Sequence, residues 1–286
     1  MAERQGLDGD LIRLALFGSP IKASLSPRIH RLFAGQFGLQ IDFQRIEANA
    51  EAFPAELEKF RDAGGVGCNI TLPLKHDAWQ LATESTPAVS LAQASNTLVY
   101  KASGWSAHNT DGIGLVTDLT RNHGVELNGR RIMILGAGGA VAGILGELLA
   151  HDPAEIMLVN RNPERAWGLA KRFSPVGYIN VTPLKDLPCM VLPEQDRFDL
   201  VINATSLGHH GEAPPLTRDL FAAGALCYDL NYFKASQPLK KYCDEMRQPY
   251  IDGLGMLVEQ AARSFQIWTG KQPETRSVIE ACKRNL

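Results

Sequence analysis

The sequence Arg131-Ile-Met-Ile-Leu-Gly-Ala-Gly-Gly-Ala140 joins an apolar strand to a glycine cluster, and a helical pattern follows it. Gly136 permits a tight turn out of the strand, and Gly138 and Gly139 carry no side chain that would keep a pyrophosphate away from the backbone. The helix that begins there points free N–H groups and its positive dipole end at such an anion. The turn is therefore predicted to bind a dinucleotide through Gly136, Ala137, Gly138, Gly139 and Ala140.

The next expected strand, 155–160, indicates which dinucleotide is bound. An acidic residue at its end would contact the adenosine ribose and select NAD, whereas this chain has Asn160 and Arg161 there. A neutral amide and a guanidinium accept a 2′-phosphate that a carboxylate would repel. Val141 replaces the third glycine of the strict pattern, and an ordinary strand–helix turn is the alternative. The strand–turn–helix–strand context favours an NADP-binding redox enzyme.

Four polar clusters precede this region at expected strand or hairpin ends, where α/β folds bind their ligands. Ser24 and Ser26, two residues apart on an extended loop, could face one carboxylate, although Ser26-Pro27 is also typical of a helix start. The other clusters are Asn69-x-Thr71 with Lys75, then Asn96, and then 109–112 with Asp111. Each has an ordinary alternative: a solvated lysine, a turn-favouring amide and a helix-capping aspartate.

Composition excludes several classes of protein. Hydrophobic residues make up 45% of the 286 residues and charged residues 21%, which is typical of a globular chain. The formal net charge of −2, without a basic block, argues against nucleic acid or an anionic membrane as a partner. No apolar run is long enough to span a bilayer, and residues 1–10 lack the apolar core of a signal peptide. Five scattered cysteines without a Cys-x-x-Cys predict reduced thiols in a cytoplasmic protein, and the histidines lack metal-ligand spacing.

Strand and helix patterns alternate along almost the whole chain, which predicts an α/β fold with parallel sheets and helices on their faces. Strands are expected at 14–17, 41–46, 66–72, 131–135, 156–160, 198–202 and 226–230, and a hairpin at 96–109. Helices are expected at 28–37, 54–63, 111–122, 254–268 and 274–283. About 110 residues precede the dinucleotide region, enough for a second α/β domain that carries the catalytic groups.

Taken together and in this order, these clusters resemble the shikimate dehydrogenase family over about residues 13 to 280. The matching segments are Ser24-x-Ser26-Pro27, Asn69-x-Thr71-x-Pro73-x-Lys75, Asn96-Thr97, 109–112, 136–140, Asn160-Arg161, 202–206, Tyr228-Asp229 and 252–256. The resemblance implies an oxidoreductase that reversibly reduces 3-dehydroshikimate to shikimate with NADPH, in aromatic amino-acid biosynthesis. It also implies two domains: a substrate domain at 1–111, completed by C-terminal helices at 253–286, and a Rossmann-type NADP-binding domain at 112–252, with a cleft between them.

The resemblance also assigns roles to single residues. Lys75 and Asp111 would be the catalytic pair, and the sequence leaves open which of them transfers the proton. Six residues would bind the substrate: Ser24, Ser26 and Tyr232 its carboxylate, and Thr71, Asn96 and Gln260 its hydroxyls. Beyond the glycine turn, NADP would contact Asn160, Arg161, Arg165, Thr205, Gly253 and Met256. No metal is required, because lysine supplies the positive charge.

Relatives of this family leave three alternatives. Some members oxidise quinate as well as shikimate, and another acts on an amino analogue of shikimate. Ser26 is the residue found in shikimate-selective members, and Asn160-Arg161 argues against NAD. A non-catalytic regulator that binds NADP or a metabolite would be expected to have lost Lys75 or Asp111, and both are present. The sequence leaves monomer and homodimer equally open, as it does the physiological direction of the reaction.

Overall fold

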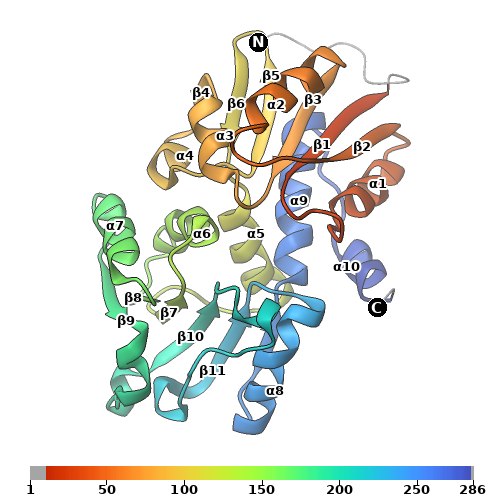
Figure 1. The fold of residues 1–286 in the computed structure, drawn as a ribbon. Coiled ribbons are helices and arrows are strands. Elements are labelled where there is room, and N and C mark those ends of the chain that lie inside the picture. Colours follow the sequence, from red (N-terminus) through yellow and green to blue (C-terminus); the bar gives the residue numbers. More distant parts are fainter. Residues whose placement is uncertain (1–10, 285–286) are drawn as a thin grey trace. The chain divides into compact units, whose positions relative to one another are not determined.

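Residues 11–284 are described by a computed structural model, and the chain divides into two compact units. Unit 1 runs up to Gly114 and resumes at Val258, and unit 2 comprises Leu115–Leu257 (Figure 1). The sequence-based domain boundaries, at 111/112 and 252/253, stand a few residues away from these divisions. The expectation about residues 1–10 lies outside the described residues.

Unit 1 contains a six-stranded mixed sheet. Its order is β2 (Ile41–Glu47), β1 (Ile12–Gly18), β3 (Gly65–Ile70), β5 (Thr97–Lys101), β6 (Gly104–His108) and β4 (Glu84–Ser85). β1 pairs in parallel with both of its neighbours, whereas β5 is antiparallel to β3 and β6. The sheet is therefore mixed, and the predicted hairpin at 96–109 forms part of its antiparallel half. The short Ser103-Gly104 hairpin, which the sequence did indicate, joins β5 directly to β6, and a tight turn permits only antiparallel pairing.

Alternating side chains of β1 divide unit 1 into two apolar layers. Ala15 and Phe17 pack with residues of α2 (Phe53–Asp62), α3 (Lys75–Leu81) and α4 (Pro87–Ala92). Leu14 and Leu16 pack on the other face in a cluster that includes Trp268 of α9 (Leu254–Thr269). The indole N–H of Trp268 donates to the backbone oxygen of Leu98 at 2.9 Å, which ties α9 to β5. Two further helices, α1 (Ser26–Gln36) and α10 (Arg276–Lys283), complete the unit.

Unit 2 contains a six-stranded sheet in which every pairing is parallel. The order is β12 (Tyr250–Asp252), β11 (Phe221–Asp229), β10 (Phe198–Asn203), β7 (Arg131–Leu135), β8 (Glu155–Asn160) and β9 (Ile179–Pro183). This is the strand order of a doubly wound dinucleotide-binding fold. Met133 and Leu135 pack in a cluster with residues of α8 (Gln237–Met246), and the intervening Ile132 and Ile134 are also fully buried. The sheet is therefore covered on both faces, as parallel sheets require.

Several short elements were not predicted from the sequence. β4, β9 and β12 lie at sheet edges, and none exceeds five residues, so none shows a sustained pattern. The helix expected at 111–122 is α5 (Asp111–Thr117), continued by a π-helical turn at Asp118–Asn122. The helices α6 (Gly139–Leu149) and α7 (Pro163–Phe173) connect β7, β8 and β9 in unit 2.

Candidate active site

Lys75 and Asp111 form an ion pair in unit 1, although 36 residues separate them in the sequence. The Lys75 Nζ atom lies 2.5 Å from Asp111 Oδ2, and only 13% and 8% of the two side chains are exposed. Lys75 begins α3, and Asp111 begins α5, where its backbone N–H donates to Asn109 Oδ1 at 3.0 Å. The alternative of a solvated surface lysine does not describe this position. The pair offers an ammonium and a carboxylate that hold each other in place.

The amide of Asn96 contacts the second oxygen of Asp111. Asn96 Nδ2 lies 2.8 Å from Asp111 Oδ1 and 3.1 Å from Gln260 Oε1. Thr110 lies beside both, with its Oγ1 atom 3.3 Å from the same Gln260 oxygen. Asn96 is 3% exposed, and Gln260 is half-buried on α9. Four of the predicted residues, Lys75, Asp111, Asn96 and Gln260, thus form one hydrogen-bonded group.

A second, fully buried polar layer lies behind this group. Asn69 Nδ2 donates to Thr97 Oγ1 at 3.3 Å and to Ser264 Oγ at 3.1 Å, and Thr97 Oγ1 lies 2.7 Å from Ser264 Oγ. Asn69 Oδ1 lies 3.0 Å from Nε2 of His30, and burial lowers the pKa of that imidazole to about 3. His30 stacks on Phe43, with ring centroids 4.7 Å apart. The layer therefore contains a neutral histidine in an aromatic pocket.

Ser24 and Ser26 are close together at the start of α1. Ser24 Oγ donates to Ser26 Oγ and accepts from the Ser26 backbone N–H, both at 3.2 Å. Ser26 is the first helical residue, Leu25 holds the N-cap position, and no side chain caps the helix there. The capping alternative for Ser26 therefore does not hold. Arg45 donates to the Ser24 backbone oxygen at 2.8 Å, which fixes the loop. Thr71, half-buried, donates its backbone N–H to Phe17 at the end of β1 at 2.9 Å.

The glycine turn of unit 2 has the backbone that an anion site needs. Gly136 has a φ of +119°, and a Cβ atom added there would lie 3.0 Å from the Ala204 backbone oxygen. Gly138 stands at the N-cap of α6, no side chain caps that helix, and a Cβ there would meet open space. The first N–H groups of α6 can therefore donate hydrogen bonds to a ligand. Val141, in place of the third glycine, is fully buried.

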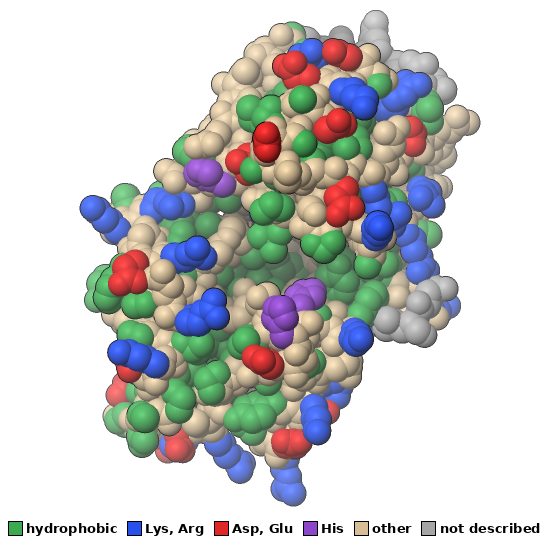
Figure 2. Space-filling model, in the orientation of Figure 1, with side chains coloured by type: hydrophobic (Ala, Val, Ile, Leu, Met, Phe, Trp, Pro, Cys, Tyr) green, Lys and Arg blue, Asp and Glu red, His purple; other side chains and the backbone are tan. Residues whose placement is uncertain are grey.

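Asn160, Arg161 and Arg165 stand at the junction of β8 and α7. Asn160 Nδ2 donates to the Asn162 backbone oxygen at 2.7 Å, and Asn162 Oδ1 caps α7 by accepting from the Glu164 N–H at 3.0 Å. Both arginines are exposed, and within residues 11–284 neither forms an ion pair. Figure 2 shows Lys and Arg side chains gathered over the part of unit 2 that contains α7. These guanidinium groups are available to a phosphate.

The remaining predicted cofactor residues follow β10 and β12. The backbone N–H and the Oγ1 of Thr205 both donate to Asn203 Oδ1, at 3.1 and 2.7 Å. Gly253 is buried, and a Cβ atom there would lie 2.3 Å from the Leu230 backbone oxygen, so only glycine fits. Met256 is buried near the start of α9. Tyr232 is half-buried and belongs to unit 2, whereas the other five predicted substrate residues belong to unit 1.

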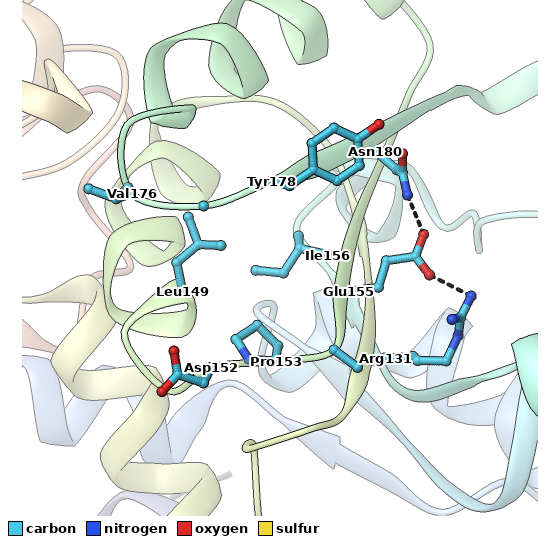
Figure 3. Close-up of a pocket in the computed structure, with 11 residues that line it drawn as sticks. Arg131, Leu149, Asp152, Pro153, Glu155, Ile156, Val176, Tyr178 and Asn180 are labelled. Atoms are coloured by element: carbon cyan, nitrogen blue, oxygen red, sulfur yellow. Dashed lines mark hydrogen bonds and ion pairs between the residues drawn. The ribbon is translucent and has the colours of Figure 1, made fainter.

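A pocket of about 330 Å³ in unit 2 is distinct from the glycine turn (Figure 3). Arg131 and Glu155 line it at the amino ends of β7 and β8, whereas the glycine turn follows the carboxyl end of β7. Two of its charged groups, Arg131 and Glu155, neutralise each other. Arg131 Nη2 lies 2.5 Å from Glu155 Oε2, and Asn180 Nδ2 donates to Glu155 Oε1 at 2.6 Å. The pocket therefore presents no unpaired cation or anion from these residues to a ligand.

Among residues 11–284 no cluster of histidine, cysteine and acidic side chains has the arrangement of a metal site. No helix within the same range is long and apolar enough to cross a membrane. The five cysteines are free thiols, and four of them are buried.

Comparison with known proteins places both units in one family. Residues 16–98 match the shikimate dehydrogenase substrate binding domain, 118–210 match shikimate / quinate 5-dehydrogenase, and 253–283 match the shikimate 5′-dehydrogenase C-terminal domain. The chain is 44% identical to the shikimate dehydrogenase (NADP+) of Alkalilimnicola ehrlichii over 95% of its length and 98% of that protein. The chain belongs to the shikimate dehydrogenase family.

Solved structures agree with this family assignment. The fold is similar to an Ael1 enzyme from Pseudomonas putida, with 38% identity, a TM-score of 0.85, and coverage of 94% of this chain and 97% of that one. It is also similar to shikimate 5-dehydrogenase from Thermus thermophilus in complex with NADP(H) and shikimate. The identity is 30% and the TM-score 0.79, and the alignment covers 96% of this chain and all of the other.

The site residues predicted from the sequence do not include every member of the buried polar layer. Asn69, Thr97 and Thr110 belong to the segments that carried the resemblance, but no role was assigned to them. Ser264 and His30 were not singled out at all. Ser264 stands four residues after Gln260 on α9, so helical spacing alone would have placed it on the same face. His30 carried no signal, because a histidine among apolar residues is indistinguishable in sequence from one at the surface.

Proposed function

We propose that this protein catalyses the reversible NADP-linked interconversion of shikimate and 3-dehydroshikimate. One observation carries the proposal: the buried Lys75–Asp111 pair, hydrogen-bonded through Asn96 to Gln260, stands in a chain 44% identical to a shikimate dehydrogenase (NADP+). The reaction is a step in the biosynthesis of aromatic amino acids. Of the alternatives, a non-catalytic regulator is disfavoured because Lys75 and Asp111 are both present and in contact.

The proposed chemistry assigns opposite tasks to the two members of the pair. NADPH, when bound, supplies a hydride to the carbonyl carbon of 3-dehydroshikimate. The carbonyl oxygen then gains negative charge, which the Lys75 ammonium stabilises while it stands ready to donate a proton. Asp111 orients Lys75 through Oδ2 and receives a hydrogen bond from Asn96 at Oδ1. Thr71, Asn96 and Gln260 are proposed to bind the substrate hydroxyls, and Ser24 and Ser26, with Tyr232, its carboxylate.

For the cofactor, we propose that unit 2 binds NADP, while unit 1 forms the substrate domain with α9 and α10. The glycine turn at 136–140 and the uncapped start of α6 suit a pyrophosphate. Arg161 and Arg165 suit the 2′-phosphate, with Asn160 beside them. Thr205, Gly253 and Met256 complete the proposed contacts. A guanidinium forms charge-assisted hydrogen bonds to phosphate that it does not form to a ribose hydroxyl, which accounts for NADP rather than NAD.

A steady-state assay tests the proposal directly. The purified protein is given shikimate or quinate, each with NADP+ or NAD+, and the appearance of reduced cofactor is followed by absorbance. We expect shikimate with NADP+ to have the highest kcat/KM of the four combinations. Faster turnover of quinate would assign the protein to the quinate-using branch, and no turnover with either acid would refute the proposal.

A further inference from the structure

The buried polar layer of unit 1 is a chain of hydrogen bonds that leads from His30 to Asp111. The His30 ring is neutral, because burial holds its pKa near 3, and its Nδ1 atom has no partner among the described residues. A proton on Nδ1 would be a buried unsatisfied donor, so the proton belongs on Nε2, where it is donated to Asn69 Oδ1 at 3.0 Å. The reverse orientation of Asn69 would place its oxygen against the Asn96 backbone oxygen, which Nδ2 now contacts at 3.3 Å.

From Asn69 onward each hydroxyl has one proton to give. Asn69 Nδ2 donates to Ser264 Oγ at 3.1 Å, and Ser264 Oγ donates to the Gln260 backbone oxygen at 3.1 Å and lies 2.7 Å from Thr97 Oγ1. Thr97 in turn donates to Asn96 Oδ1 at 3.0 Å. The backbone N–H of Thr110 donates to the same oxygen at 2.8 Å. With its oxygen held by two donors, Asn96 can only turn Nδ2 toward Asp111 Oδ1, 2.8 Å away.

We infer that Thr97 and Ser264 are positioning residues that set the orientation of the Asn96 amide, and through it the acceptor geometry of Asp111. This inference rests on the proposed function, in which Asp111 acts on the reaction. Neither hydroxyl needs to contact substrate, since both residues are fully buried behind Asn96. Without the Thr97 donor, the Asn96 oxygen would lose one of the groups that hold it, and the amide would be fixed less firmly. The hydrogen bond from Asn96 to Asp111, the partner of Lys75, would then be less well oriented.

Thr97 permits a matched pair of variants. Thr97→Val removes the hydroxyl and keeps the shape, whereas Thr97→Ser keeps the hydroxyl and removes a methyl group. We expect Thr97→Val to lower kcat for shikimate about tenfold, which corresponds to about 1.4 kcal/mol, with KM for shikimate changed less than about threefold. Thr97→Ser should retain at least about half of the wild-type kcat. Ser264→Ala removes the hydroxyl that contacts Thr97, and it should also lower kcat for shikimate. It replaces Thr97→Val as the test variant if Thr97→Val does not fold.

Thr269→Val is the matched control. Thr269 is also a buried hydroxyl residue of α9, and it donates to the Phe265 backbone oxygen at 2.8 Å, outside the chain that leads to Asp111. The control should match wild type in kcat, and thermal melts of all variants report any loss of folding.

A double-mutant cycle gives the decisive comparison. In an Asn96→Ala background, Thr97→Val should cause no further loss of kcat, because its effect passes through the missing amide. An undiminished loss in that background would overturn the inference, and so would a kcat for Thr97→Val within twofold of wild type.

A measurement without turnover separates this inference from the proposed function. The side-chain amide protons of Asn96 are assigned in an NMR spectrum by their disappearance in Asn96→Ala. Thr97→Val should shift them and speed their exchange with solvent, whereas Thr269→Val should leave them unchanged. Unchanged Asn96 signals in Thr97→Val would refute the positioning role. If the wild-type protein failed to oxidise shikimate, the proposed function would fall, while this spectrum would still decide whether the chain orients Asn96.

Discussion

The candidate sites of the two units consist of different kinds of chemical group. In unit 1 the site consists of side chains that are buried and bonded to one another, with Lys75 2.5 Å from Asp111 and Asn96 2.8 Å from the same carboxylate. In unit 2 it consists of backbone and exposed charge: Gly136 with its positive φ, Gly138 facing open space, and Arg161 at the surface.

This difference reflects two physical tasks. A group that must stabilise charge in a transition state has to be oriented before the substrate arrives, and buried hydrogen bonds do this. A large anionic cofactor can be bound by N–H groups at a helix start and by flexible guanidinium groups, provided that nothing occupies the space it needs. Substitutions in unit 1 should therefore change mainly turnover, and substitutions in unit 2 mainly cofactor binding. Three experiments test that division, and a fourth tests the stability of unit 2.

The largest effect is expected at Lys75. Lys75→Ala removes the ammonium that stabilises the developing charge, so kcat should fall by about 10²–10⁴-fold while KM for shikimate and NADP+ changes much less. Steady-state kinetics at saturating substrates measure this. Lys59→Ala is the control, since the Lys59 side chain is 78% exposed on α2. A folded Lys75→Ala protein with kcat within threefold of wild type would remove Lys75 from the mechanism.

Asp229 provides a test of stability in unit 2. It is fully buried on β11, and burial raises its pKa to about 6, against hydrogen bonds from Asn231, Asn203 and Tyr250 that lower it. Because the folded-state pKa lies above the unfolded value of 3.8, the folded protein binds more protons between these values, and its stability falls as pH rises through them.

Asp229→Asn cannot ionise, so it should escape this loss. Its free energy of unfolding relative to wild type should rise from pH 4 to pH 6 and then level off, by up to about 3 kcal/mol. Urea unfolding across this pH range measures the difference. A pH-independent difference between the two proteins would show that Asp229 does not titrate in the folded state as described.

Arg161 tests whether unit 2 distinguishes the two cofactors by charge. Arg161→Ala should raise KM for NADP+ by at least about tenfold and leave KM for NAD+ nearly unchanged, because one charge-assisted hydrogen bond to phosphate contributes about 1.5–3 kcal/mol. Lys171→Ala, in the last turn of α7, is the control. Equal losses with both cofactors would mean that Arg161 does not contact the 2′-phosphate.

The smallest effect is expected at Gly138. The protein leaves open space there, and φ is −95°, so alanine fits the fold and the melting temperature should change little. The added methyl group would, however, stand where the pyrophosphate approaches, and NADP+ affinity should fall about fivefold, which corresponds to loss of one ordinary hydrogen bond. Titration of NADP+ by calorimetry measures this, with Gly168→Ala on α7 as the control. Undiminished affinity would place the pyrophosphate elsewhere.

The sequence by itself determined the features that depend on neighbouring residues. The strand, glycine turn and helix from Arg131 onward are local, as is the Asn160-Arg161 pair, and the structure contains the elements at these positions. The order of the polar segments sufficed to name the family, which the comparisons confirm. Short edge strands such as β9 and β12 were missed, because a strand of three to five residues acquires its pattern only from the sheet it joins.

Only the tertiary structure decided which polar groups meet. Asn96 and Gln260 are 164 residues apart in the chain, and their contact exists because α9 packs on the sheet of unit 1 through Trp268. The same packing brings Ser264 to Thr97, and a second long-range contact joins His30 of α1 to Asn69 of β3. Residue types and spacing carry no information about such long-range contacts, because they are fixed by how whole elements bury their apolar faces. The sequence therefore predicted Lys75 and Asp111 as one pair, whose catalytic role stays a proposal, and the packing of α9 determined which groups surround the pair.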